Sequence, residues 1–138
     1  MSKDTTTTDT ADFSQFLLST TGRVEISLPN GEPMLYQGKQ VAVHVFSPAS
    51  AEYARAEAAL QRAARERLFG SKKKVNDAEE EAETNARFLV TVTSSIENFP
   101  YPGGPEAIYR ERKLGYIADQ VRSYLNDQGN FYKPSKTS

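Results

Sequence analysis

His44 is the only histidine in a chain of 138 residues that contains no cysteine. It belongs to "QVAVHVF", in which Val41, Val43 and Val45 recur at the two-residue period of a strand. We therefore expect His44 on the face opposite these valines, exposed to solvent or at an interface. Catalysis needs several convergent groups. The sequence therefore predicts no catalytic, cofactor-binding or metal-binding residues, and a protein that is not an enzyme.

An acidic run, "DAEEEAE" at 77–83, is the nearest approach to a carboxylate metal site. It stands at the start of an expected helix, where acidic side chains interact favourably with the helix dipole. The stretches "PNG" and "PGG" do not follow the strand–loop–helix pattern of a phosphate-binding loop. We interpret the run as a solvated helix start and the two stretches as turns.

One basic cluster surrounds the end of the preceding helix. Its members are Arg62, Arg65, Arg67, Lys72, Lys73 and Lys74. A nucleic-acid-binding domain usually has an overall basic excess, whereas this chain has 17 basic and 18 acidic residues. We instead expect an antiparallel hairpin in which this basic end lies beside the acidic start of the next helix. The three lysines at the hairpin tip remain candidates for contact with another protein.

Large apolar side chains in polar or Pro/Gly-rich surroundings are the candidate partner-binding residues. They are Phe13, Phe16, Leu17, Phe99, Tyr101, Phe131 and Tyr132. Phe99 and Tyr101, in "ENFPYPGGP", have two open interpretations: partner anchors, or loop aromatics that plug the core. Likewise, "DFSQFLLS" is either a short helix packed on the domain or an apolar segment that awaits a partner.

The elements expected to position these residues are three short strands followed by helices. Alternation and turn residues predict strands in "GRVEISL", "MLY" and "QVAVHVF", joined as an antiparallel meander. A helix then starts at Ser50 or Ala51, and its stripe from Tyr53 to Leu68 should cover the valine face. A second helix is capped by Asn76 or Asp77 and carries an apolar stripe as far as Ile96, before the Pro/Gly-rich break at 97–105. A third occupies 105–128, where Gly115 either kinks it or separates a short helix from the main one.

The predicted fold class is α+β: a small antiparallel two- to three-stranded sheet packed on a three-helix, mainly α-helical bundle. We expect residues 1–11 to be a disordered, Thr-rich tail, 12–132 a single domain, and 133–138 a flexible tail. No apolar run approaches the roughly 20 residues that span a bilayer, and the first residues lack the apolar region of a secretory signal. We expect a soluble cytoplasmic protein.

Three stretches carry a resemblance to a known family: "VFSPASAEYARAE", "TSSIENFPYPGGPEAI" and "IADQVRSYLNDQGNFYK". Together with the order of elements, they resemble the tail assembly chaperones of long-tailed bacteriophages. The resemblance covers about residues 22–134. Its motifs are loose patterns of a hydrophobic helix end before an aromatic, Gly-bearing loop, and of "I-x-x-Q-V" before a late aromatic residue.

The resemblance implies a non-enzymatic protein of the infected bacterial cytoplasm. It would bind the tape measure protein and keep it soluble during tail tube assembly, and would be absent from the finished virion. The implied partners are the tape measure protein and the tail tube protein, with self-association as a further option; no membrane or nucleic acid is implied. The alternatives from other classes are a structural tail or neck component of the virion and a small nucleic-acid-binding regulator.

Overall fold

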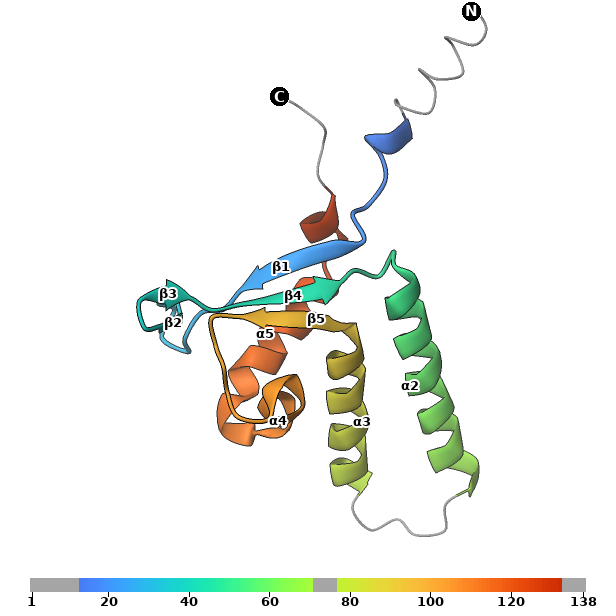
Figure 1. Ribbon diagram of the computed structural model, residues 1–138. Helices are drawn as coiled ribbons and strands as arrows, with labels where there is room; N and C mark the ends of the chain where they lie inside the picture. Colours follow the sequence, from blue (N-terminus) through green and yellow to red (C-terminus); the bar gives the residue numbers. More distant parts are fainter. Residues whose placement is uncertain (1–12, 71–76, 133–138) are drawn as a thin grey trace, which may run out of the picture.

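The computed structural model describes residues 13–70 and 77–132 (Figure 1). The elements are β1 (Thr21–Glu25), β2 (Leu35–Tyr36), β3 (Lys39–Gln40), β4 (Ala42–Phe46), α2 (Ala51–Gly70), α3 (Asp77–Val92), β5 (Thr93–Glu97), α4 (Gly104–Arg110), the 3₁₀ turn η1 (Arg112–Leu114), α5 (Gly115–Leu125) and the 3₁₀ turn η2 (Gln128–Phe131). The described part is α+β, as expected, but it has four α-helices rather than three. The tails expected at 1–11 and 133–138, and the three lysines 72–74, lie outside the described residues.

The main sheet has three antiparallel strands in the order β1-β4-β5. Val24 of β1 pairs with Val43 of β4, which pairs with Ile96 of β5. The strand β5 corrects the prediction, because 93–96 were expected in the second helix. Val92 and Ile96 suit a helical stripe, but the β-branched Thr93 and Ile96 also fit a strand, and pairing with β4 overrides local propensity.

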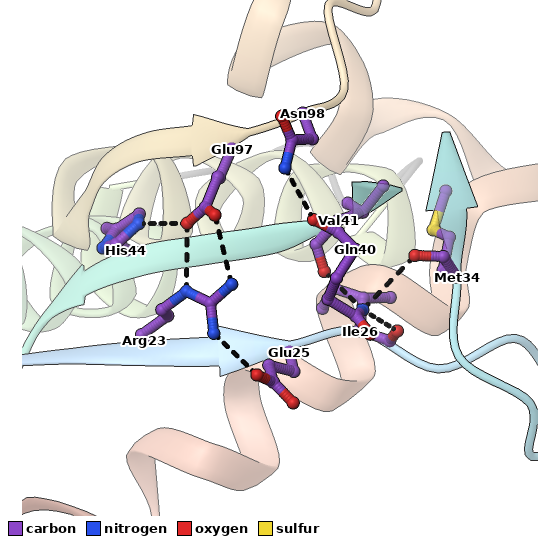
Figure 2. A network of polar contacts seen from close by, with 9 residues as sticks. All are labelled: Arg23, Glu25, Ile26, Met34, Gln40, Val41, His44, Glu97 and Asn98. Carbon is purple, nitrogen blue, oxygen red and sulfur yellow. Dashed lines mark hydrogen bonds and ion pairs between the residues drawn. The ribbon is translucent and has the colours of Figure 1, made fainter. Parts of the chain in front are cut away.

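The strands β2 and β3 form a separate hairpin rather than part of a meander. Their two-residue turn has positive φ at Gln37 (52°) and Gly38 (80°), the backbone of a type I′ turn. The side-chain amide of Gln40 fixes the hairpin to the sheet: its Nε2 donates to the carbonyl oxygens of Ile26 (2.9 Å) and Val41 (2.8 Å) (Figure 2). The hairpin therefore projects from one end of the main sheet (Figure 1).

The valine face of the sheet is covered by the C-terminal half of the chain. Figure 1 shows α5 against this sheet, and its expected stripe is buried through Ile117, Val121 and Leu125. Gly115 begins α5 after the 3₁₀ turn η1, so it separates two helices rather than kinking one. Contacts of α4 with β5 complete this side of the core.

The helix α2 packs mainly against α3, not on the valine face as expected. Ser50 caps it: the Ser50 Oγ accepts from the Tyr53 N–H at 3.1 Å. Tyr53 meets Phe88 of α3 edge-to-face, with ring centroids 5.4 Å apart. The expected apolar stripe holds only over the first part of the helix, because Leu68 is 78% exposed.

The two ends of the described chain meet beside β1. The Ser19 N–H donates to the Phe131 carbonyl oxygen (2.7 Å), and Leu18 forms an isolated antiparallel bridge with Tyr132. Phe131 is fully buried and packs edge-to-face on Tyr124. The residues just before β1 are thereby held in place by the end of the chain.

Candidate functional site

The outer face of the sheet carries a charged cluster that spans all three strands. Both Arg23 of β1 and His44 of β4 contact Glu97 of β5 (Figure 2). The Arg23 Nε and Nη2 donate to the two Glu97 carboxylate oxygens at 3.0 and 3.1 Å, and the His44 Nε2 lies 2.7 Å from Glu97 Oε1. His44 thus lies on the face opposite the valines, as predicted, and it takes part in an ion-pair cluster.

The contacts in this cluster favour the ionised form of Glu97. Hydrogen bonds first from Arg23 and then from His44 lower the pKa of Glu97 from 4.5 to about 2. The same contact raises the pKa of the Arg23 guanidinium. Arg23 pairs with two carboxylates, Glu25 and Glu97, and the cluster links the three strands of the sheet across its outer face.

Within residues 13–70 and 77–132, no group of three or more His, Cys, Asp or Glu side chains converges on a possible ion. None of the helices in this part of the chain is long and apolar enough to cross a membrane.

A depression of about 860 Å³ runs between α3 and the α4–α5 pair. Small and apolar side chains, including Ala82, Ala86 and Ala118, form its floor. Its rim is charged, and the Arg110 guanidinium there donates two hydrogen bonds to Glu83. These bonds are the main cause of the lowered pKa of Glu83 and of the raised pKa of Arg110. The groove therefore has both charge signs on its rim and selects no particular ionic ligand.

The first candidate binding surface is the turn at 13–17. The Phe16 N–H donates to the Phe13 carbonyl oxygen at 2.9 Å, and the Leu17 N–H to that of Ser14 at 3.2 Å. Phe13, Phe16 and Leu17 are nevertheless 64–65% exposed. Of the two interpretations of this segment, the structure shows a folded turn whose apolar side chains are not packed on the domain.

The second candidate surface joins the Pro/Gly loop to the β2–β3 hairpin. Phe99 stacks on Tyr101 with ring centroids 5.6 Å apart, and Tyr36 meets Phe99 edge-to-face at 5.9 Å. Phe99 and Tyr101 are half-buried, and Tyr36 and Leu35 are exposed. The loop aromatics therefore pack partly on the core and partly form an exposed aromatic strip.

Phe131 and Tyr132, the third pair of candidate partner-binding residues, differ in burial. Phe131 lies wholly in the core, so it is removed as a partner anchor; a 3₁₀ turn directs its ring inward against Tyr124. Tyr132 keeps 41% of its surface exposed. The polar residues around the two aromatics gave no signal for this difference.

Sequence reasoning missed Leu68 and Phe69, which are the most exposed large apolar residues of the described chain. The pair "LF" directly before Gly70 was the available signal, because two adjacent residues cannot both face one neighbouring helix. The helices α2 and α3 are antiparallel neighbours, as predicted (Figure 1). Among residues 51–69 and 78–92 no ion pair joins the two helices, and Glu83 pairs with Arg87 and Arg110.

Comparisons with protein-family models, curated proteins and solved structures find no significant match to this chain.

Proposed function

We propose that the protein is a non-enzymatic assembly chaperone that binds helical segments of a phage tape measure protein. It keeps that partner soluble in the host cytoplasm while tail tube subunits assemble. The proposal rests on the family resemblance of the three sequence stretches and on the surface that the fold leaves exposed. A tape measure protein is a long helical chain with apolar stripes, and its chaperone needs an apolar surface to cover them.

The observation that carries the proposal is the exposed turn of Phe13, Phe16 and Leu17. Its backbone is hydrogen-bonded, and Leu18 and Ser19 fix its base to the end of the chain. Its side chains therefore remain exposed although the segment is folded and anchored. Clustered apolar side chains that stay in water on a folded chain mark protein-binding surfaces. A partner helix with an apolar stripe would cover this turn at little ordering cost to the chaperone.

Co-expression with the tape measure protein tests this proposal. The wild-type chain is expected to co-purify with the partner and hold it in the soluble fraction. The triple variant Phe13→Ser, Phe16→Ser, Leu17→Ser should lose the partner to the insoluble fraction while its circular dichroism and Tm stay unchanged, because these side chains are exposed. The matched control is Leu68→Ser with Phe69→Ser, which removes exposed apolar surface outside the candidate binding surfaces and should retain the partner.

Two results would contradict the proposal. One is a triple variant that holds the partner as well as the wild type does. The other is the presence of the chain at stoichiometric levels in purified virions, which would favour a structural tail or neck component.

A further inference from the structure

A pocket of about 380 Å³ lies between the β2–β3 hairpin and the loop that follows β5, at the end of the main sheet away from α2 (Figure 1). The rings of Tyr36 and Phe99 meet there at 83°, so they form two walls of an apolar corner. The Asn98 Nδ2 donates to the Gln40 carbonyl oxygen at 3.0 Å, and this bond ties the loop to the hairpin (Figure 2). The lining residues and their neighbours in the sequence all belong to the described part of the chain. The pocket is therefore formed before any ligand arrives.

The charge at this pocket is positive. Among the described residues that line it, only Lys39 is charged. Lys39 is exposed and forms no ion pair with any residue that the structure describes. The pocket therefore fits a ligand that combines an apolar ring with a carboxylate.

The turn "LPNGEP" at 28–33, which leads into the hairpin, has this chemistry. Pro29, Glu32 and Pro33 are exposed, and Glu32 forms no ion pair within residues 13–70 and 77–132. The backbone of the turn is fixed, because the Glu32 N–H donates to the Asn30 Oδ1 at 3.0 Å and the Leu28 N–H to the Glu32 carbonyl oxygen at 2.7 Å. The turn can therefore enter a pocket at little ordering cost.

We propose that this end of the molecule is an interface between two copies of the chain, in which the turn 28–33 of each copy occupies the pocket of the other. A proline ring of the turn lies against Tyr36 and Phe99, and Glu32 pairs with Lys39 across the interface. A two-fold contact requires a surface that is complementary to itself, and the turn and the pocket meet this requirement because one end of the chain carries both. A single-stranded nucleic acid could also stack on the aromatic rings, but it would need a positively charged groove along its backbone, and the pocket offers one lysine.

A charge-swap experiment with the full chain tests the interface. Lys39→Glu leaves two acidic groups at the contact, and Glu32→Lys leaves two basic groups. We expect sedimentation equilibrium to give the wild type twice the monomer mass of 15.3 kDa, and each variant alone to be monomeric. An equimolar mixture of the two variants should dimerise again, because each group then meets its opposite in the other copy. The control Lys113→Glu makes the same charge change at an exposed lysine of η1 and should stay dimeric.

The apolar corner gives an independent measurement. Tyr36→Ser should weaken dimerisation by at least about tenfold in Kd, because it removes one wall of the pocket. Leu68→Ser with Phe69→Ser, at exposed apolar residues of α2, should leave Kd unchanged.

Three results would overturn the proposal: a wild type that stays monomeric, a dimer that survives either charge variant, or a mixture of the two variants that stays monomeric. None of them bears on capture of the tape measure protein by the N-terminal turn, which is unchanged in these variants. The two proposals therefore fail separately.

Discussion

The α-carbon of Gly22 lies against the ring of Phe131. A Cβ at Gly22 would stand 2.6 Å from Phe131 Cε1 and 2.9 Å from Tyr124 Cε1. Both distances are too short for a carbon–carbon contact, so only glycine allows the Phe131 side chain to close over β1. This contact explains how Phe131, seven positions from the last residue of the sequence, becomes part of the core.

Gly22→Ala should therefore lower the free energy of unfolding by about 1 to 3 kcal/mol, because the ring stack must shift. The matched control is Gly115→Ala. No heavy atom lies within 4 Å of a Cβ at Gly115, whose backbone is helical. Alanine there should leave stability unchanged or raise it by up to about 1 kcal/mol. Urea unfolding measures both values, and equal effects of the two substitutions would contradict the contact.

Phe131→Ala should cost about 3 to 5 kcal/mol, as expected for a fully buried aromatic side chain. Tyr132→Ala is the adjacent control and should cost much less, because its side chain is 41% exposed. If Phe131 were instead a partner anchor, its removal would weaken association and leave the unfolding midpoint unchanged.

Periodicity predicted the elements in which one face is buried continuously. The alternation of Val41, Val43 and Val45 and the stripe of α5 both describe contacts that each segment makes along one side, so the sequence was sufficient for them. It was not sufficient for β5. Val92 and Ile96 are four residues apart, and only pairing with β4, some 50 residues earlier in the chain, decides between helix and strand.

The candidate binding residues likewise include some features that the local sequence indicates and others that depend on distant contacts. Exposure of Phe13, Phe16 and Leu17 was one of two interpretations that the sequence left open, whereas the burial of Phe131 depends on the absence of a side chain at the distant Gly22.

Tyr109 should govern alkaline unfolding. Its hydroxyl lies 2.7 Å from the Thr93 Oγ, and that hydroxyl donates to the Leu89 carbonyl oxygen, so Tyr109 is the donor of the pair. Burial raises the pKa of Tyr109 to about 12. The group therefore stabilises the fold fully below pH 10, and this contribution is lost as pH rises from 10 through 12. Tyr109→Phe should lower the free energy of unfolding at neutral pH by about 1 kcal/mol. It should also reduce the loss of stability between pH 10 and 12. A variant that loses as much stability as the wild type over this range would contradict this role.

Glu97 should make the corresponding contribution in acid. Because its pKa falls from 4.5 to about 2 on folding, its stabilisation is present above pH 4.5 and is lost as pH falls through 2. In this window the unfolded chain binds up to one more proton than the folded chain at this carboxyl. Glu97→Gln should remove that difference, so the variant is less stable at neutral pH and loses less stability between pH 4.5 and 2.

A double-mutant cycle with Arg23 separates the ion-pair cluster from a general effect of charge. The hydrogen bond from Arg23 is the main cause of the low pKa of Glu97, so Arg23→Gln should bring that pKa back toward its ordinary value. The Arg23 variant should therefore also lose less stability than the wild type as the pH falls from 4.5 to 2. Once either partner is gone, removal of the other should have little further effect, because the interaction is already absent. Carboxyl titration by NMR in the wild type and in Arg23→Gln measures the pKa directly. Effects of the two substitutions that add in full would show that Arg23 and Glu97 act on stability independently.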